Sequence, residues 1–184
     1  MMKVEVLERL TDKQKEVMIL YYREGYTQAE IAEMLGIGRR TVSDRIEAAL
    51  KRIRKEERVD YSHIAPSGFG TADMLIIGKD EQGRGLLHVC DFKTGAGVFV
   101  DADHNSQMML YALGGLAAYG FLYDVEIVRM SIIQPRLDNI STCEMPVSEL
   151  NAWAESIKPI AIMAYEGKGE QHPGDWCRFC RATH

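Results

Sequence analysis

The sequence predicts an α+β or α/β fold, in which an all-helical segment over residues 1–56 precedes a mixed sheet flanked by helices over residues 57–184. Apolar residues recur at helical spacing from Leu10 to Lys55, which is typical of amphipathic helices. After Val59, glycines cluster and short β-branched and apolar runs alternate with turn sequences, which indicates strands. No stretch rich in Gly, Ser or Pro separates the two segments, so we expect a stiff junction.

Length and composition limit the classes of protein that this chain can be. Its 184 residues suit one medium domain, or a small and a medium one, and 46% hydrophobic and 27% charged residues are ordinary for a globular protein. No apolar run approaches the roughly 20 residues needed to cross a bilayer, and the N-terminus lacks an apolar secretion segment. We therefore expect a cytoplasmic protein without membrane contact.

Charge is unevenly distributed along the chain. The net charge is −5, but residues 1–58 hold 13 of the 22 Lys and Arg and 11 of the 27 Asp and Glu, a net of +2. The remaining residues hold 9 basic and 16 acidic side chains. A local basic stripe matters more for phosphate contact than the total charge does. The N-terminal segment is therefore the candidate for nucleic-acid binding.

Cap signals divide the N-terminal segment into helices. Thr27 followed by Glu30 fits a capping box that starts a helix. Gly36 stands where that helix should end. We expect the final helix to run from about Arg39 to about Glu57, with its apolar residues turned inward.

Two helices joined by a tight turn form the geometry that inserts the start of the second helix into the major groove of DNA. The outward-facing residues of that helix are the predicted DNA contacts: Arg39, Arg40, Thr41, Ser43, Arg45, Lys51 and Arg52. Arginine can contact guanine edges in the groove, and basic residues further along the helix can hold phosphates. A trihelical unit whose solvated basic face contacts proteins is the alternative.

The stretch from Leu10 to Lys55 resembles region four of the sigma-70 class of sigma factors and related small phage regulators. This resemblance implies a helix-turn-helix that binds DNA, with RNA polymerase as a candidate partner. Gly38 stands where the family usually has Ser or Thr, a difference of only a few tenths of a kcal/mol because Gly is tolerated at an N-cap. Helix-turn-helix proteins often bind DNA as dimers, so a homodimer stays open.

The C-terminal segment is expected to hold three strands and two helices. The predicted strands are Thr71–Ile77, Leu86–Lys93 and Val125–Gln134, and the polar turn Lys79–Gly85 joins the first two as a hairpin. The predicted helices are Asp103–Tyr119 and Ser148–Tyr165, with Ser148 as the cap of the second.

Three short motifs in this segment carry the candidate chemistry: Gly70-Thr-Ala-Asp73, Asp91-Phe-Lys93-Thr-Gly and Gln107-Met-Met-Leu-Tyr111. Asp91 and Lys93 are two apart in a strand and share a face, and the hairpin brings Asp73 alongside. Two carboxylates and a backbone carbonyl form a hard oxygen site suited to Mg²⁺ or Mn²⁺. An ionised Asp91 in an otherwise apolar strand is costly without a partner, which favours a site over surface decoration.

We therefore predict Asp73 and Asp91 as metal ligands in a phosphodiester-hydrolysing site. The metal would bind the scissile phosphate and lower the pKa of a water. Lys93 would orient the nucleophile or stabilise charge on phosphorus. Gln107 and Tyr111 lie four apart on one helix face and could contact the DNA strand.

These motifs resemble the PD-(D/E)XK nuclease superfamily, in its RecB-like branch with the Gln-x-x-x-Tyr helix, and the stretch from Glu57 onward is similar to a phage-encoded RecB-like family. The resemblance implies a restriction-endonuclease-like sheet and a metal-dependent deoxyribonuclease of phage or prophage origin, acting in a bacterial cytoplasm with phage replication or recombination proteins as candidate partners. RecB-like enzymes usually have an upstream helix that adds a Glu or His, and here the helix-turn-helix occupies that place. A non-enzymatic phage transcription regulator with an inert nuclease-like domain is therefore the alternative.

A cysteine pair, Cys177 and Cys180, lies near the end of the sequence. Some RecB-like nucleases hold an iron–sulfur cluster with cysteines in this region, so the resemblance suggests a remnant of such a site. Zinc would need these two cysteines, His184 and a fourth ligand from Cys90, Cys143 or His172. A thiol pair that only packs is the favoured alternative.

Overall fold

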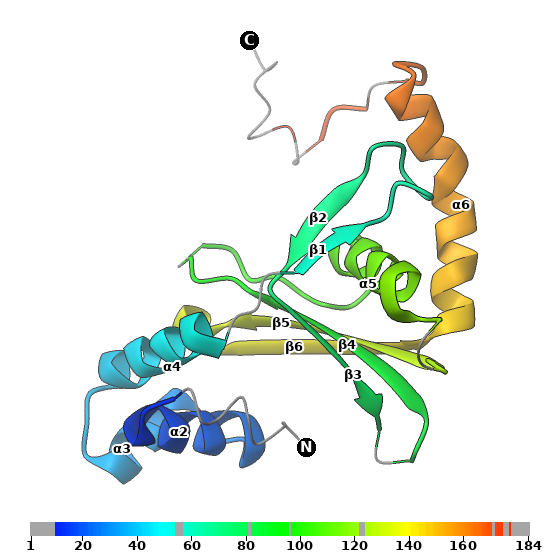
Figure 1. Cartoon of the computed structure of the whole chain (residues 1–184). Coiled ribbons are helices and arrows are strands. Elements are labelled where there is room, and N and C mark those ends of the chain that lie inside the picture. The colour runs from blue at the N-terminus through cyan, green and yellow to red at the C-terminus, as the bar shows by residue number, and fades with distance from the viewer. Residues whose placement is uncertain are drawn as a thin grey trace.

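The computed structural model describes residues 10–53, 57–80, 82–95, 97–121, 124–170, 172–174 and 177, without the side chains of Arg23 and of residues 50–53. It confirms a mixed α+β architecture with a helical N-terminal segment, a two-stranded sheet and a four-stranded mixed sheet (Figure 1). None of the described helices has both the length and the apolar composition needed to cross a membrane.

The helices of the N-terminal segment are α2 (Asp12–Met18), which continues into the π-helical turn η1 (Ile19–Arg23), α3 (Gln28–Leu35) and α4 (Arg39–Ile53). The predicted capping box is confirmed, because the Thr27 and Glu30 side chains each bond the other residue's backbone N–H. Gly36 ends α3 in the left-handed region at φ 61°, where a residue without Cβ meets no steric penalty.

The strands of the rest of the chain are β1 (Glu57–Asp60), β2 (Phe69–Ala72), β3 (Met74–Lys79), β4 (Gly85–Phe92), β5 (Ile127–Gln134) and β6 (Asn139–Pro146). β1 and β2 form an antiparallel pair. The other four lie in the order β3-β4-β5-β6, and within them only β4 and β5 run parallel. That parallel step needs a crossover, which α5 (Ser106–Tyr119) supplies. A short helix, η2 (Pro135–Leu137), follows β5, and α6 (Val147–Tyr165) follows β6.

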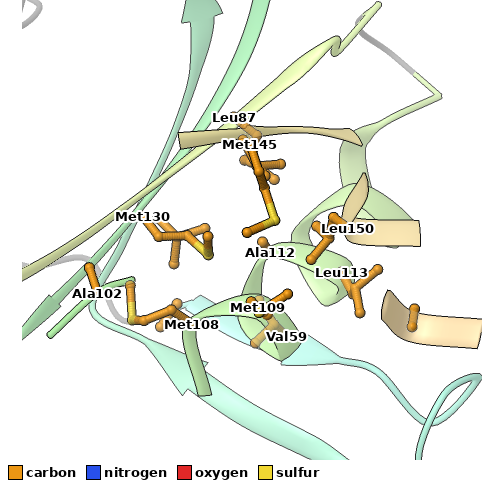
Figure 2. Packing of buried hydrophobic residues seen from close by; sticks show 14 of the residues in the cluster. Val59, Leu87, Ala102, Met108, Met109, Ala112, Leu113, Met130, Met145 and Leu150 are labelled. Atoms are coloured by element: carbon orange, nitrogen blue, oxygen red, sulfur yellow. The ribbon is translucent and has the colours of Figure 1, made fainter. Parts of the chain in front are cut away.

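The larger core lies between α5 and one face of the four-stranded sheet (Figure 2). Met108 and Met109 of α5 are almost fully buried there with Leu87 of β4 and Met130 of β5. A Cβ on Gly114 would lie 2.8 Å from the Val59 Cβ, so this glycine lets α5 approach β1 closely. α5 is therefore closely packed against β1.

The helix-turn-helix packs on the opposite face of the sheet, at one end (Figure 1). Cys90 and Ile133 of the sheet are buried in one cluster with the core residues of α2, α3 and α4, and Met74 and Phe92 pack against it. β4 thus separates two cores, because its alternate residues point to opposite faces. Cys90 and Phe92 point to the helix-turn-helix face of the sheet. Asp91, which lies between them in the strand, therefore points to the α5 face.

Several predicted boundaries were wrong. The strand expected over Thr71–Ile77 is broken at Asp73, where the chain bends from one sheet into the other. Glu57 begins β1 rather than ending the long helix, and α6 begins at Val147 with Pro146 as its N-cap, so Ser148 is not the cap. The sequence did not indicate β6, because this strand exposes alternate polar residues and lacks an apolar run.

Candidate functional site

The two predicted metal-binding carboxylates are buried side by side on the sheet. Met74 pairs with Cys90, so Asp73, one residue earlier, falls opposite Asp91 in the antiparallel register. Asp73 is 4% exposed and Asp91 is 7% exposed. The backbone N–H of Phe92 donates to Asp73 Oδ2 at 2.7 Å, which fixes the Asp73 carboxylate against the peptide that follows Asp91.

Lys93 and Gln107 close around Asp91. Lys93 Nζ lies 2.9 Å from Asp91 Oδ2 and donates to Gln107 Oε1 at 3.3 Å. Gln107 Nε2 donates to Asp91 Oδ1 at 3.4 Å and to Tyr111 Oη at 3.1 Å. Side chains from the end of β4 and the first turns of α5 therefore form one hydrogen-bonded network around a buried carboxylate.

Gly70 explains why Tyr111 can reach this network. A Cβ at Gly70 would lie 2.2 Å from Tyr111 Cε1, closer than two carbon atoms can approach. The tyrosine ring therefore occupies the space that a side chain on β2 would take. Asn105 caps α5 by accepting from the Met108 N–H at 3.3 Å, so Gln107 lies in the first turn of the helix and faces the end of β4.

The residues present fit a hard divalent cation. Within the part of the chain that the structure describes, no group of three or more His, Cys, Asp or Glu side chains is arranged to hold a metal. Mg²⁺ is usually held by one or two carboxylates together with waters and substrate phosphates. Two buried carboxylates beside one lysine match that pattern, whereas a four-ligand zinc site would need more side chains.

Two buried amide side chains hold the loop that joins Lys93 to α5. Gln134 Oε1 accepts from the Val100 N–H at 2.8 Å, and Gln134 Nε2 donates to the Val98 carbonyl at 3.0 Å. Asn139 Nδ2 donates to the Val100 carbonyl at 3.1 Å. These bonds fix the segment between the two parts of the candidate site.

In the helix-turn-helix, the predicted DNA contacts do not all face outward. Val42 and Ile46 are fully buried in the core of α4, and Arg39, Arg40 and Thr41 are exposed. Arg45 is partly buried. Lys51 and Arg52 lie in α4, but their side chains are outside the described residues.

The prediction that Ser43 faces outward was wrong, because only 9% of this residue is exposed. Ser43 lies on one stripe of α4 with Arg39 and Glu47, spaced four residues apart, and η2 covers that stripe. Arg136 Nε of η2 lies 2.9 Å from Glu47 Oε1, and Arg39 Nη2 lies 3.8 Å from Asp138 Oδ2.

Gln28 adds a buried contact between the helix-turn-helix and the sheet. Its side chain is 1% exposed and donates to the Pro135 carbonyl, and its backbone N–H donates to Asp138 Oδ2 at 3.4 Å. Tyr21 lies nearby. The pKa of its hydroxyl is raised, chiefly by burial and secondly by the nearby Asp138 carboxylate. We call the contacts of Gln28, Arg39 and Glu47 with Pro135, Arg136 and Asp138 the junction.

The cysteines are separate from the carboxylate site. Cys90 is buried between the sheet and the helix-turn-helix, and burial raises the pKa of its thiol to about 12. Cys177 Sγ accepts from the Gly174 N–H at 3.4 Å. Cys180 and His184 lie outside the described residues, so the zinc and iron–sulfur alternatives stay predictions.

A family model described as "Protein of unknown function (DUF2800)" matches residues 2–184, nearly the whole chain. The chain belongs to the DUF2800 family. The match runs through both the helix-turn-helix and the sheet, so both segments of this DUF2800 chain are covered by one family model.

A second similarity is confined to part of the chain. RNA polymerase sigma factor SigO of Bacillus subtilis (strain 168) is 40% identical over 52 residues, which are 28% of this chain and 30% of the sigma factor. The DUF2800 chain thus matches less than a third of that relative's length. No solved structure matches the chain at a significant level.

The junction of this DUF2800 chain is a structural feature that the sequence did not predict. Glu47 is an acidic residue in a basic helix, and Asp138 ends the segment Gln134-Pro-Arg-Leu-Asp. Glu47 falls on the stripe of α4 that carries Arg39 and Ser43, where an acidic residue can pair with a basic partner. The partners themselves could not be assigned, since Arg136 and Glu47 are 89 positions apart.

Proposed function

We propose that this DUF2800 chain is a DNA-binding, metal-dependent nuclease of the RecB-like PD-(D/E)XK type. One observation carries the proposal. Hydrogen bonds and an ion pair link four side chains into one network: Asp91, Lys93, Gln107 and Tyr111. The Asp73 carboxylate joins them by accepting from the backbone N–H of Phe92, the residue after Asp91. A set of separate surface residues would have no reason to converge on two buried carboxylates.

Lys93 supplies the positive charge of the proposed site. Its ammonium bonds both Asp91 and Gln107 and is only partly exposed, so these contacts restrict its position. A fixed cation at this position would bind a non-bridging oxygen of the scissile phosphate and stabilise the charge that builds up during attack. Gln107 would keep Asp91 and Lys93 aligned, because its amide bonds both.

Asp73 and Asp91 would hold the divalent cation. Bound Mg²⁺ or Mn²⁺ supplies Lewis-acid activation of water and neutralises charge on the phosphate. Burial of the two carboxylates keeps their oxygens fixed without long side-chain motions, and the Phe92 N–H orients Asp73. The Gln107 amide donates to the Tyr111 hydroxyl. Tyr111 would contact the DNA strand next to the two carboxylates and the bound cation.

The helix-turn-helix would dock the enzyme on duplex DNA. The exposed start of α4 carries Arg39, Arg40 and Thr41, and Lys51 and Arg52 follow in the same helix. The similarity of this segment to a sigma factor supports DNA binding and also makes RNA polymerase a candidate partner. Arginine side chains in this position suit guanine edges in the major groove.

A cleavage assay with matched variants tests the proposed site. Asp91→Asn keeps the size of the side chain but removes the charge that faces Lys93, and Lys93→Ala removes the ammonium. Each variant should lose at least 100-fold of the cleavage rate, a loss of the size seen when a fixed stabilising group is removed. Lys79→Ala, at the exposed end of β3, is the control and should cleave at the wild-type rate.

The second candidate is a non-enzymatic DNA-binding regulator whose sheet domain is inert. It is favoured by the number of ligands, because among the described residues no third His, Cys, Asp or Glu side chain is placed to hold a metal ion together with the two carboxylates. A salt-sensitive gel shift by the wild-type protein, without cleavage in Mg²⁺ or Mn²⁺, would favour this function over the nuclease.

A further inference from the structure

A cavity lies where the helix-turn-helix meets η2, apart from the carboxylate site. Its volume is about 430 Å³. The residues that line it come from α3, α4 and η2: Gln28, Arg39, Arg40, Ser43, Asp44 and Arg136. Three of the six are arginines and one, Asp44, is acidic. The arginines belong to two elements almost 100 positions apart in the sequence, so folding gathers them around this open cavity.

The arginines keep donors available for a ligand. A guanidinium has five N–H donors, and Arg136 bonds Glu47 through Nε. The Arg136 side chain is 51% exposed and the Arg39 side chain 57% exposed. Arg39 lies 3.8 Å from Asp138, which is an ion pair beyond hydrogen-bonding distance. Glu47 and Asp138 therefore position these two arginines without occupying all their donors.

Ser43 adds a hydroxyl group to the same lining. The residue is 9% exposed and lies one helical turn from Arg39. Its hydroxyl can donate to an acceptor that binds beside the arginines.

We infer that this cavity binds a phosphate group of the DNA backbone, so that Arg136 of the sheet domain and Arg39 and Arg40 of α4 hold one DNA strand together. Phosphate oxygens accept from several guanidinium donors and from a serine hydroxyl at once, and the planar fork of arginine suits them. The inference rests on the proposed DNA binding. It adds a DNA contact outside the helix-turn-helix and orients the DNA relative to the carboxylate site.

The test separates a phosphate contact from a structural ion pair. Glu47→Gln breaks the pair with Arg136 but keeps the arginine, and the double variant Glu47→Gln/Arg136→Gln removes the arginine without leaving a buried carboxylate unpaired. DNA affinity is measured by fluorescence anisotropy with a labelled duplex over a series of salt concentrations. In Glu47→Gln the amide oxygen can still accept from Arg136 Nε, and one negative charge beside the cavity is removed, so this variant should bind DNA at least as tightly as wild type. The double variant should bind about 3- to 10-fold more weakly than Glu47→Gln, with a salt slope smaller by about 1.

Equal affinities and equal salt slopes of the two variants would overturn the inference and leave the proposed function standing. Failure of the wild-type protein to bind DNA would overturn both. Thermal unfolding of each variant checks the fold. If the double variant is unfolded, titration of the wild-type protein with inorganic phosphate decides, because the backbone amide resonance of Ser43 should shift, and no shift would overturn the inference.

Discussion

At the scale of single residues, the candidate site depends on one glycine as much as on its charged groups. Gly70 carries no chemistry, yet the Tyr111 ring occupies the space beside its Cα. The network from Asp91 through Gln107 ends at that tyrosine. The position of the ring is therefore set by a residue more than 30 positions away in the sequence.

Gly70→Ala should lower the cleavage rate at least 10-fold, because the added methyl group displaces Tyr111 and with it Gln107. Steady-state cleavage of labelled DNA measures the effect. Gly78→Ala on β3 is the matched control, since a Cβ there meets no atom within 4 Å. If Gly70→Ala cleaves like Gly78→Ala, Tyr111 does not position the site.

His88 should make the protein less stable in mild acid. The pKa of His88 is lowered to about 4 in the folded state, chiefly by burial and then by the Arg129 guanidinium. The Glu144 carboxylate acts in the opposite direction but is the smaller effect. The unfolded chain binds a proton below pH 6.5 and the folded one does not, so the free energy of unfolding is highest above pH 6.5. It should fall by up to about 1.4 kcal/mol per pH unit between pH 6.5 and 4.

The measurement is urea unfolding at several pH values, for the wild type and for His88→Gln. The glutamine variant lacks the titrating group, so the difference between the two proteins should change across this pH range. A constant difference would mean that His88 does not titrate as its burial implies.

At the scale of elements, the predictions that succeeded were those with local causes. The capping box of α3 and its glycine end follow from residues within one turn, and so does the location of Gln107 and Tyr111 on one face of α5. The bend at Asp73 and the strand β6 have no local signal. Asp73 turns the chain because β2 and β3 belong to different sheets, and that depends on how distant strands pair.

Thr27→Ala should cost about 1 kcal/mol of unfolding free energy, because it removes the cap of the α3 N-terminus. Chemical denaturation measures this loss. Thr27→Ser keeps the hydroxyl and should stay close to wild type. An equal loss in both variants would show that the methyl group of the threonine, rather than its cap, stabilises the helix.

At the scale of the whole molecule, the helix-turn-helix and the sheet share a core. Cys90 and Ile133 of the sheet are buried among residues of α2–α4, and the junction adds ion pairs at the same end. The sequence predicted each half separately, since each has its own motifs, and it indicated no specific contact between them. Packing between residues about 90 or more positions apart could not be predicted from spacing.

Ile133→Ala should destabilise both halves together. It deletes buried apolar atoms at their shared core, a change that typically costs 2–5 kcal/mol. Unfolding followed by far-ultraviolet circular dichroism and by tryptophan fluorescence should give one coincident transition at a lower denaturant concentration. Two separate transitions, with the helical one unchanged, would mean that the halves fold independently.

The most direct measurement of the central claim is DNA cleavage by the purified wild-type protein in Mg²⁺ or Mn²⁺. Labelled linear duplex and single-stranded DNA are incubated with metal, with EDTA, and with Asp91→Asn in place of the wild type. We predict cleavage that requires the metal and disappears in the variant. Cleavage that persists in EDTA or in Asp91→Asn, or no cleavage of either DNA by the wild type, would contradict a nuclease centred on Asp73 and Asp91.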